Sequence, residues 1–362
     1  MVRIAPEARP SIVGLERDEI ARALVGRPDA AWRAAQIAKW IYQKGASEFG
    51  QMHDLPVPLR DELAASHSLM PLHVAAHVRS ADGVEKVLAH GGDENVFECV
   101  LLPYASRVSC CISSQVGCPM GCTFCATGLG GFARNLTAGE IVAQYLLLQS
   151  HSPRRIGHVV FMGMGEPLLN LPNVLKAIRL LHDEVGLSHR HITVSTVGLA
   201  PQIRKLAELK LPINLALSLH STSDEIRDRL MPVNRKWPVA EVVEAMREYG
   251  RKTGRKITIE YLLISELTDT LSQAADLAKL VQGVPSVVNL IPWNWVQTEQ
   301  GFARPSRERV RAFRRELELR GVNVTERVER GHDIAAACGQ LAGQHGRLAG
   351  RNLSQGSPAP LP

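Results

Sequence analysis

The sequence predicts an α/β fold, a partial or full (β/α) barrel with a small helical domain at its N-terminus. Three observations lead to this prediction. From residue 107 onward, short runs rich in valine and isoleucine alternate with helical patterns, which is typical of parallel βαβ units. The strand-like runs are apolar on both faces, as expected for a sheet that helices cover. Unusual polar residues follow most of these runs, and barrel enzymes build their sites at the carboxyl ends of strands.

The part of the chain before the barrel divides into two predicted segments. Residues 1–70 are predicted to form a helical accessory domain, because apolar residues recur there at helical spacing. The helical stretches are 18–24, 30–42 and 59–65. Residues 71–105 are predicted to link this domain to the barrel through strands that flank the Gly91-Gly92 turn. These two strands are 83–89 and 96–102.

The barrel is predicted over residues 106–343, and the tail over residues 344–362. The predicted strands of the barrel are 107–112, 158–162, 191–195, 213–219, 256–263 and 286–291. The helices between them are 138–149, 173–182, 200–209, 239–249 and 271–281. The tail is rich in glycine, serine and proline, and we expect it to be disordered.

Composition narrows the class of protein. The 362 residues contain no run of eighteen apolar residues and no secretory signal, so we expect a cytoplasmic enzyme without a membrane partner. Seven cysteines in such a chain argue against a disulfide framework and favour metal-binding or catalytic thiols. The net charge of +6 permits a polyanionic partner, but a slightly basic enzyme of any kind would also show it.

Three cysteines lie within eight residues at the end of the first predicted barrel strand. Cys118, Cys122 and Cys125 have the spacing Cys-x3-Cys-x2-Cys. Thiolates are the usual ligands of a [4Fe–4S] cluster, and three of them leave one iron free to bind a small molecule. A structural zinc site is the alternative, but zinc in such sites takes four protein ligands, and no nearby cysteine or histidine completes a pair downstream.

The triplet resembles the signature of the radical-SAM superfamily, whose members cleave S-adenosylmethionine (SAM). Further segments resemble the ribosomal RNA adenine carbon-2 methyltransferases, whose sister family methylates carbon 8 of the same base. These segments are 111–118, 163–167, 195–198, 218–220 and 330–341. The resemblance extends over about residues 33–343, and its most specific part surrounds Cys338, because ordinary radical-SAM enzymes lack that segment.

The resemblance implies a barrel of the radical-SAM type and a role for each matched residue. Cys338 becomes methylated, Cys111 resolves a covalent intermediate by forming a disulfide bond, and Glu98 matches the proton acceptor of the family. The ligands of the [4Fe–4S] cluster are Cys118, Cys122 and Cys125. The predicted SAM contacts are Gly165, Glu166, Ser195, Ser218, Leu219, His220 and Asn294.

The chemistry explains why such residues are needed. Carbon 2 of adenine lies between two ring nitrogens and is too electron-poor to attack a SAM methyl group. The family mechanism therefore uses two SAM molecules per turnover: one methylates Cys338, and the other supplies a radical that activates this methyl group. The implied partners are RNA, ribosomal and possibly transfer RNA, and an electron donor such as flavodoxin. The N-terminal domain is expected to contact the RNA.

Several residues admit a second interpretation. Cys111 lies in a predicted strand, where lone cysteines are usually core residues, and Glu98 could be a solvated strand residue. Cys110 and Cys99 are predicted to pack in the core, since strand neighbours face opposite ways. Candidate base-stacking residues are Trp237, Trp293 and Trp295.

The alternatives to the carbon-2 methyltransferase are a carbon-8 methyltransferase, a radical-SAM enzyme with another substrate, and a zinc-stabilised RNA-binding module. An activase that generates a protein radical would need neither Cys338 nor Cys111. The segment after Asn294 departs from the family pattern, which usually has a proline-containing, glycine-rich loop there.

Overall fold

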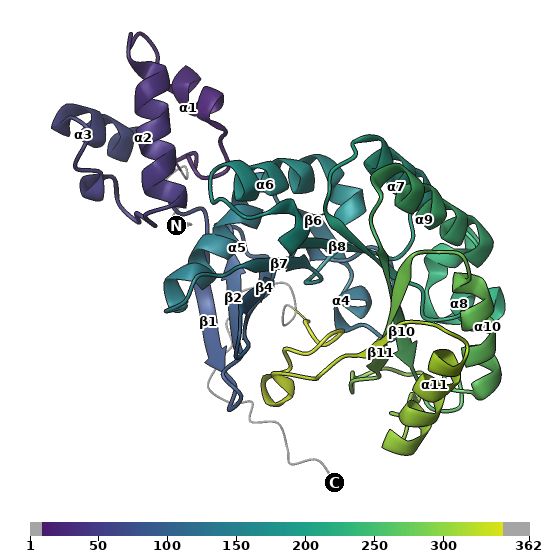
Figure 1. The fold of residues 1–362 in the computed structure, drawn as a ribbon. Helices are drawn as coiled ribbons and strands as arrows, with labels where there is room; N and C mark the ends of the chain where they lie inside the picture. Colours follow the sequence, from purple (N-terminus) through teal and green to yellow (C-terminus); the bar gives the residue numbers. More distant parts are fainter. Residues whose placement is uncertain (1–8, 343–362) are drawn as a thin grey trace.

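The computed structural model describes residues 9–342, and the predicted disordered tail, 344–362, lies outside them. Three helices at the N-terminal end of the chain stand beside a curved sheet that is lined on its outer side by further helices (Figure 1). These three helices are α1 (Arg17–Ala23), α2 (Ala30–Tyr42) and α3 (Val57–Ser66). They match the helices predicted from apolar periodicity.

Within residues 9–342, one mixed sheet of ten strands forms the barrel wall. Its strands are β1 (His73–Arg79), β2 (Glu85–His90), β3 (Val96–Pro103), β4 (Val108–Cys111), β7 (His158–Phe161), β8 (Ile192–Thr196), β9 (Asn214–Ser218), β10 (Ile257–Leu263), β11 (Ser286–Pro292) and β12 (Val324–Glu326), in this order. β1 to β4 pair antiparallel, and β4 to β12 pair parallel. Within the described residues β1 does not pair with β12, so the barrel is a partial one.

In the described part of the chain, further helices accompany the sheet, and most of them cover its outer face (Figure 1). They are α5 (Ala138–His151), α6 (Leu171–Asp183), α7 (Ala200–Glu208), α8 (Asp224–Leu230), α9 (Val239–Thr253), α10 (Leu271–Val281) and α11 (Arg307–Leu319). Their apolar sides and the strands form one large core. The predicted α/β fold with a barrel is therefore confirmed.

Local sequence signals set the ends of these helices. Thr137 caps α5 by accepting a hydrogen bond from the Glu140 backbone, and the Glu140 carboxylate accepts one from the Thr137 backbone at 2.8 Å. α9 ends at Gly254, whose φ of 66° is the left-handed conformation that glycine adopts without a steric penalty. No helix in residues 9–342 is long and apolar enough to cross a membrane.

The structure adds elements that the sequence pattern did not predict. These are β1, β12, α8 and a small hairpin of β5 (Gln115–Gly117) with β6 (Phe132–Asn135). The hairpin encloses the cysteine loop and a short helix, α4 (Ala126–Leu129). It therefore fixes the position of the loop next to the parallel strands.

Candidate active site

The cysteine loop is shaped by close backbone contacts. Gly117 has a φ of 73°, and a Cβ there would lie 2.1 Å from the Gly131 carbonyl oxygen. The Cys118 amide donates a hydrogen bond to that same oxygen at 2.7 Å. Cys125 precedes the first residue of α4, and its amide donates to the Cys122 carbonyl. These contacts turn the loop so that its thiols share one region.

The environment of these thiols fits an iron–sulfur cluster. Burial raises the pKa of the Cys118 thiol to about 12 and that of Cys122 well above its usual value. Thiolates therefore need a cationic centre beside them in order to exist here, and a metal ligand must be a thiolate. The donor set is all sulfur, which suits iron–sulfur clusters.

Next to the loop, one cavity collects most of the predicted SAM residues. It is lined from the ends of β7, β8, β9 and β11. The predicted contacts that line it are Gly165, Glu166, Ser195, Ser218, His220 and Asn294. Cys125 and Cys338 belong to the same lining. The site therefore lies at the carboxyl ends of the parallel strands, as the sequence pattern indicated.

Glu166 is a buried carboxylate held by the backbone. Its two oxygens accept hydrogen bonds from the amides of Leu168 at 3.0 Å and Val197 at 2.9 Å. Burial nevertheless raises the pKa of Glu166 to about 7. A carboxylate oxygen has a second lone pair, so an incoming ammonium group can still be bound and would stabilise the charged form.

His220 is a neutral hydrogen-bond donor at this cavity. Its φ of 61° is unusual for a residue with a side chain. Its Nδ1 accepts a hydrogen bond from the Leu262 amide at 3.1 Å, and burial lowers the pKa of His220 to about 3. The ring is therefore uncharged, with its proton on Nε2, from which it can donate.

Leu219 differs from its neighbours in the predicted SAM segment. Its side chain is fully buried in the core and is not part of the lining of this cavity. Leu219 directly follows β9, and its amide still donates to the Glu260 carbonyl of β10 at 3.1 Å, so it continues the alternation and faces the opposite way from Ser218. The structure therefore places Ser218 and His220 at the site and assigns Leu219 to the packing behind it.

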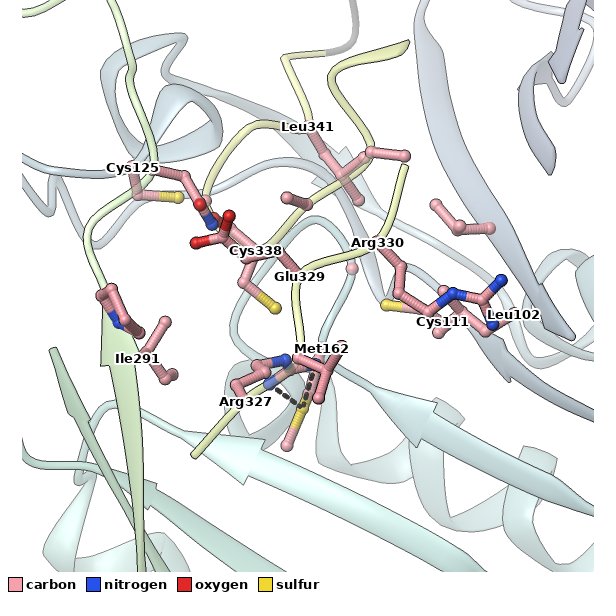
Figure 2. Close-up of a pocket in the computed structure, with 18 of the residues that line it drawn as sticks. Leu102, Cys111, Cys125, Met162, Ile291, Arg327, Glu329, Arg330, Cys338 and Leu341 are labelled. Carbon is pink, nitrogen blue, oxygen red and sulfur yellow. Dashed lines mark hydrogen bonds between the residues drawn. The ribbon is translucent and has the colours of Figure 1, made fainter. Parts of the chain in front are cut away.

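A second cavity contains the two predicted catalytic cysteines. Cys111 and Cys338 both line it, together with Arg327 and Met162, which lie side by side below Cys338 in the view of Figure 2. Some residues line both this cavity and the first one, which contains the predicted SAM contacts and is called the SAM-side cavity. They include Cys125, Asn294, Arg327 and Cys338. Cys338 therefore stands where the two cavities meet.

The loop that carries Cys338 is attached to the cysteine loop mainly through its backbone. The Asn294 side-chain amide donates to the Cys338 carbonyl at 3.1 Å. The Ala126 amide donates to the Gly339 carbonyl at 2.8 Å. Gly339 has a φ of 83°, so the chain turns sharply directly after the cysteine. The position of Cys338 thus depends on its backbone rather than on its thiol.

Glu98 occupies a different position from the two cysteines. It is buried, pairs with Lys86 at 3.2 Å, and accepts a hydrogen bond from the Ala342 amide at 3.0 Å. It is not a solvated strand residue, and within residues 9–342 it does not appear in the linings of the two cavities. Its observed contact anchors the chain that follows Cys338. Its role as proton acceptor stays a prediction.

Two arginines at the site, one buried and one partly exposed, were not predicted from the sequence. Arg227 is fully buried and donates to the carbonyls of Val197 and Leu219 at 2.6 and 3.0 Å. Arg327 is partly exposed, lines the same cavity as Cys111 and Cys338, and lies 4.0 Å from the Glu260 carboxylate. Their neighbours come from distant strands, so no local motif indicates them. Because the strand that precedes Arg327, β12 (Val324–Glu326), was not predicted either, the sequence offered no signal for this residue.

The remaining cysteines and tryptophans separate into packing and exposed groups. Cys99 and Cys110 are fully buried in the core, as predicted. Trp293 is buried, whereas Trp295 is 60% exposed. Trp295 is thus the better placed of the two for stacking on a base, and the Gln340 side chain donates to its carbonyl at 3.1 Å.

Replacing Arg327 by glutamine should slow methylation of Cys338 by about tenfold at neutral pH. Burial raises the pKa of the Cys338 thiol, and the charge of Arg327 opposes that rise. Each unit of pKa changes the thiolate fraction about tenfold, and the thiolate is the nucleophile. Intact-protein mass spectrometry measures the rate of methyl uptake. Arg327→Lys keeps the charge and should stay closer to the wild-type rate; equal rates for all three proteins would contradict the assignment.

The fold and this site together define a radical-SAM enzyme. The family model "Radical SAM superfamily" matches residues 112–278, and "Ribosomal RNA large subunit methyltransferase N-terminal domain" matches residues 11–69. A crystal structure of a radical SAM methyltransferase from Sphaerobacter thermophilus is similar, with a TM-score of 0.88, 41% identity, and coverage of 92% of this chain and 99% of that one.

Curated relatives place the chain more closely. It is 47% identical to the "Probable dual-specificity RNA methyltransferase RlmN" of Symbiobacterium thermophilum, over 92% of this chain and 91% of the relative. It is 44% identical to the "Dual-specificity RNA methyltransferase RlmN" of Anaeromyxobacter sp., over 94% and 93%. The chain therefore belongs to the RlmN family. The resemblance inferred from the motifs is confirmed.

Proposed function

We propose that this radical-SAM RNA methyltransferase methylates carbon 2 of an adenosine in large-subunit ribosomal RNA, and an adenosine in transfer RNA, through S-methylated Cys338. The observation that carries the proposal is that Cys338 lines both cavities. A methyl group accepted from the SAM side would then face the cavity that contains Cys111. The dual-specificity names of the relatives support two classes of RNA substrate.

Cys118, Cys122 and Cys125 would hold a [4Fe–4S] cluster as its three protein ligands. When bound, the cluster and SAM supply the one-electron chemistry that generates a radical, and the electron would come from a donor of the flavodoxin class. Two SAM molecules are consumed per turnover, since one provides the methyl group and the other the radical. We place the enzyme in the cytoplasm, where its RNA substrates and reduced thiols occur together.

The side chains of the SAM cavity bind and orient the cofactor. Glu166 receives the ammonium group, while neutral His220 donates a hydrogen bond and Ser195 and Ser218 offer hydroxyl groups. Asn294 contacts both cavities and donates to the Cys338 carbonyl. A shift of the bound cofactor would therefore be transmitted to the residue that carries the methyl group.

Cys338 and Cys111 act in turn on the base. Once one hydrogen atom of the Cys338 methyl group has passed to the SAM-derived radical, the remaining carbon forms a bond to carbon 2 of the adenine, which links protein and RNA through a thioether. The adduct then gives up one electron, and a base removes the proton from the ring carbon; Glu98 or Cys111 is suited to this by chemical type. The Cys111 thiolate attacks the Cys338 sulfur, the bond between that sulfur and the methylene carbon breaks, and the released carbon takes up a proton to become the methyl group of the RNA, which leaves a disulfide bond between the two cysteines.

Two tryptophans of the N-terminal helices, each beside a basic side chain, support contact between this domain and RNA. Trp32 is 58% exposed, and the Arg33 guanidinium, which is 14% exposed and pairs with Asp29, lies 4.3 Å from the centre of its ring. Lys44 lies over the Trp40 ring at 3.5 Å. Aromatic rings stack on unpaired bases, and cations contact the phosphates.

Nucleoside mass spectrometry tests the proposed product. Ribosomal and transfer RNA from cells that lack such an enzyme would be incubated with the anaerobically reconstituted protein, SAM and a reductant. We expect 2-methyladenosine in both RNA classes. The product 8-methyladenosine would place the chain with the carbon-8 enzymes, and methylation of only one RNA class would overturn the dual specificity. A protein with zinc but without iron and sulfide would overturn the radical mechanism.

A further inference from the structure

Three side chains outside the proposed active site converge on the outer face of the sheet. His77 lies on β1, Glu85 at the start of β2, and His151 at the end of α5. Residues alternate between the two faces of a strand, so Glu85 points away from the face on which its neighbour Lys86 pairs with Glu98. The cluster therefore lies on the opposite side of β2 from the catalytic cavities.

Both imidazoles approach the same carboxylate oxygen. His77 Nε2 lies 2.9 Å and His151 Nδ1 3.5 Å from Glu85 Oε2. The candidate ligand atoms of the three residues all lie within 4.8 Å of one another, and the two rings are 4.5 Å apart at 62°. Ligands about 2.0–2.1 Å from a tetrahedral zinc ion are separated by distances of this order.

The Glu85 carboxylate is accessible to a cation, and the one nearby arginine does not neutralise it fully. Glu85 is buried, with its side chain 10% exposed, while the His77 and His151 side chains are 36% and 25% exposed. A metal ion can therefore enter from solvent. Arg79 contacts the other carboxylate oxygen, Oε1, at 3.7 Å, but it is 71% exposed and its effect is screened by water.

We propose that His77, Glu85 and His151 form a binding site for a divalent transition-metal ion of the zinc type, with water as a fourth ligand. Two imidazoles and one carboxylate are a donor set that zinc accepts, and imidazole also suits nickel and copper. The site lacks sulfur, so it differs chemically from the cysteine loop. It is independent of the proposed RNA methylation.

An ion at this position would stabilise the edge of the sheet that supports the segment before Cys338. β1 is an edge strand whose side chains are mostly exposed, and the ion would join it to β2 and α5. The turn between β1 and β2 holds the segment before Cys338, because Asp82 accepts a hydrogen bond from the Gly331 amide at 3.1 Å and Asp333 accepts one from the Ala81 amide. The ion would thus stiffen the support of that segment.

Metal analysis of the full chain with its iron–sulfur cluster reconstituted tests the site. After incubation with zinc and removal of free ions, we expect about one zinc per chain in addition to the iron. His77→Gln/His151→Gln should lose this zinc, and Glu85→Gln should bind it at least about tenfold more weakly. The matched control is His73→Gln/His90→Gln, a stacked histidine pair on the same two strands, which should retain the zinc.

X-ray absorption at the zinc edge separates this site from zinc bound wrongly by cluster cysteines. The proposed site gives only nitrogen and oxygen neighbours at about 2.0–2.1 Å, whereas cysteine ligation adds sulfur at about 2.3 Å. Iron content and circular dichroism check that the variants are folded and loaded. Absence of retained zinc, sulfur in its coordination shell, or equal zinc in the wild type and the His77→Gln/His151→Gln protein would each overturn the proposal.

Discussion

Replacing Cys338 by alanine should abolish RNA methylation, with turnover reduced by a factor on the order of 10³ or more. The adenine carbon cannot take the methyl group directly from SAM, so no bypass is available without the cysteine. Cys338 is the cysteine that lines both cavities together with Cys125, a proposed cluster ligand. The measurement is methyl transfer from isotopically labelled SAM to RNA, combined with the intact mass of the protein.

The structure shows why this variant should remain folded. The Asn294 and Ala126 contacts to this segment use backbone carbonyls, so loss of the thiol leaves them in place. We therefore expect a normal iron content, normal SAM binding, and no added methyl group on the protein. Cys99→Ala, which alters a cysteine in the core, serves as the control and should retain methylation. An active Cys338→Ala protein would exclude the methyl-carrier mechanism.

The parallel part of the fold could be predicted because its strands are buried on two faces. Such strands are continuous apolar runs, and the amphipathic helices between them have a clear period. β1 escaped prediction because its side chains are mostly exposed and its apolar pattern is weak. β12 has three residues, and a segment of this length carries no periodicity. α8 has seven residues and is mostly polar, so its apolar period is weak; its local signals are the Ser223 cap and the acidic residues of its first turn.

In the site, the contiguous motifs could be predicted from the sequence, whereas contacts between residues that are far apart in the sequence could not. The cysteine loop and the Gly163–Pro167 turn are contiguous motifs, and each brings its own geometry. The role of Arg327 arises from contacts with residues far away in sequence, such as Glu260 and Met162. The contact between Glu98 and the Ala342 amide spans 244 positions. Patterns in one sequence do not encode such pairings, because they depend on how the barrel curves.

Replacing Cys111 by alanine should halt the reaction after the bond to RNA has formed. Cys111 lines the cavity that it shares with Cys338 and Arg327 (Figure 2). Burial raises the pKa of the Cys111 thiol to about 12, so it is protonated at neutral pH before it acts. Arg327 opposes that rise and is therefore suited to favour the thiolate when release is required. Without this thiol, no thiolate is available to attack the Cys338 sulfur, and the thioether between Cys338 and the base persists.

The variant protein should accumulate as a covalent complex with RNA. Denaturing electrophoresis would show an RNA-bound band, and nuclease digestion followed by mass spectrometry would locate a methylene-bridged adenosine on Cys338. Cys110→Ala is the matched control, because Cys110 is the adjacent residue but packs in the core. It should turn over without a persistent complex. The double variant Cys111→Ala/Cys338→Ala should form no complex, since the carrier is missing. Free RNA and free protein in the Cys111→Ala reaction would mean that another group resolves the intermediate, and the adjacent position of Cys111 in the cavity would then be a matter of packing alone.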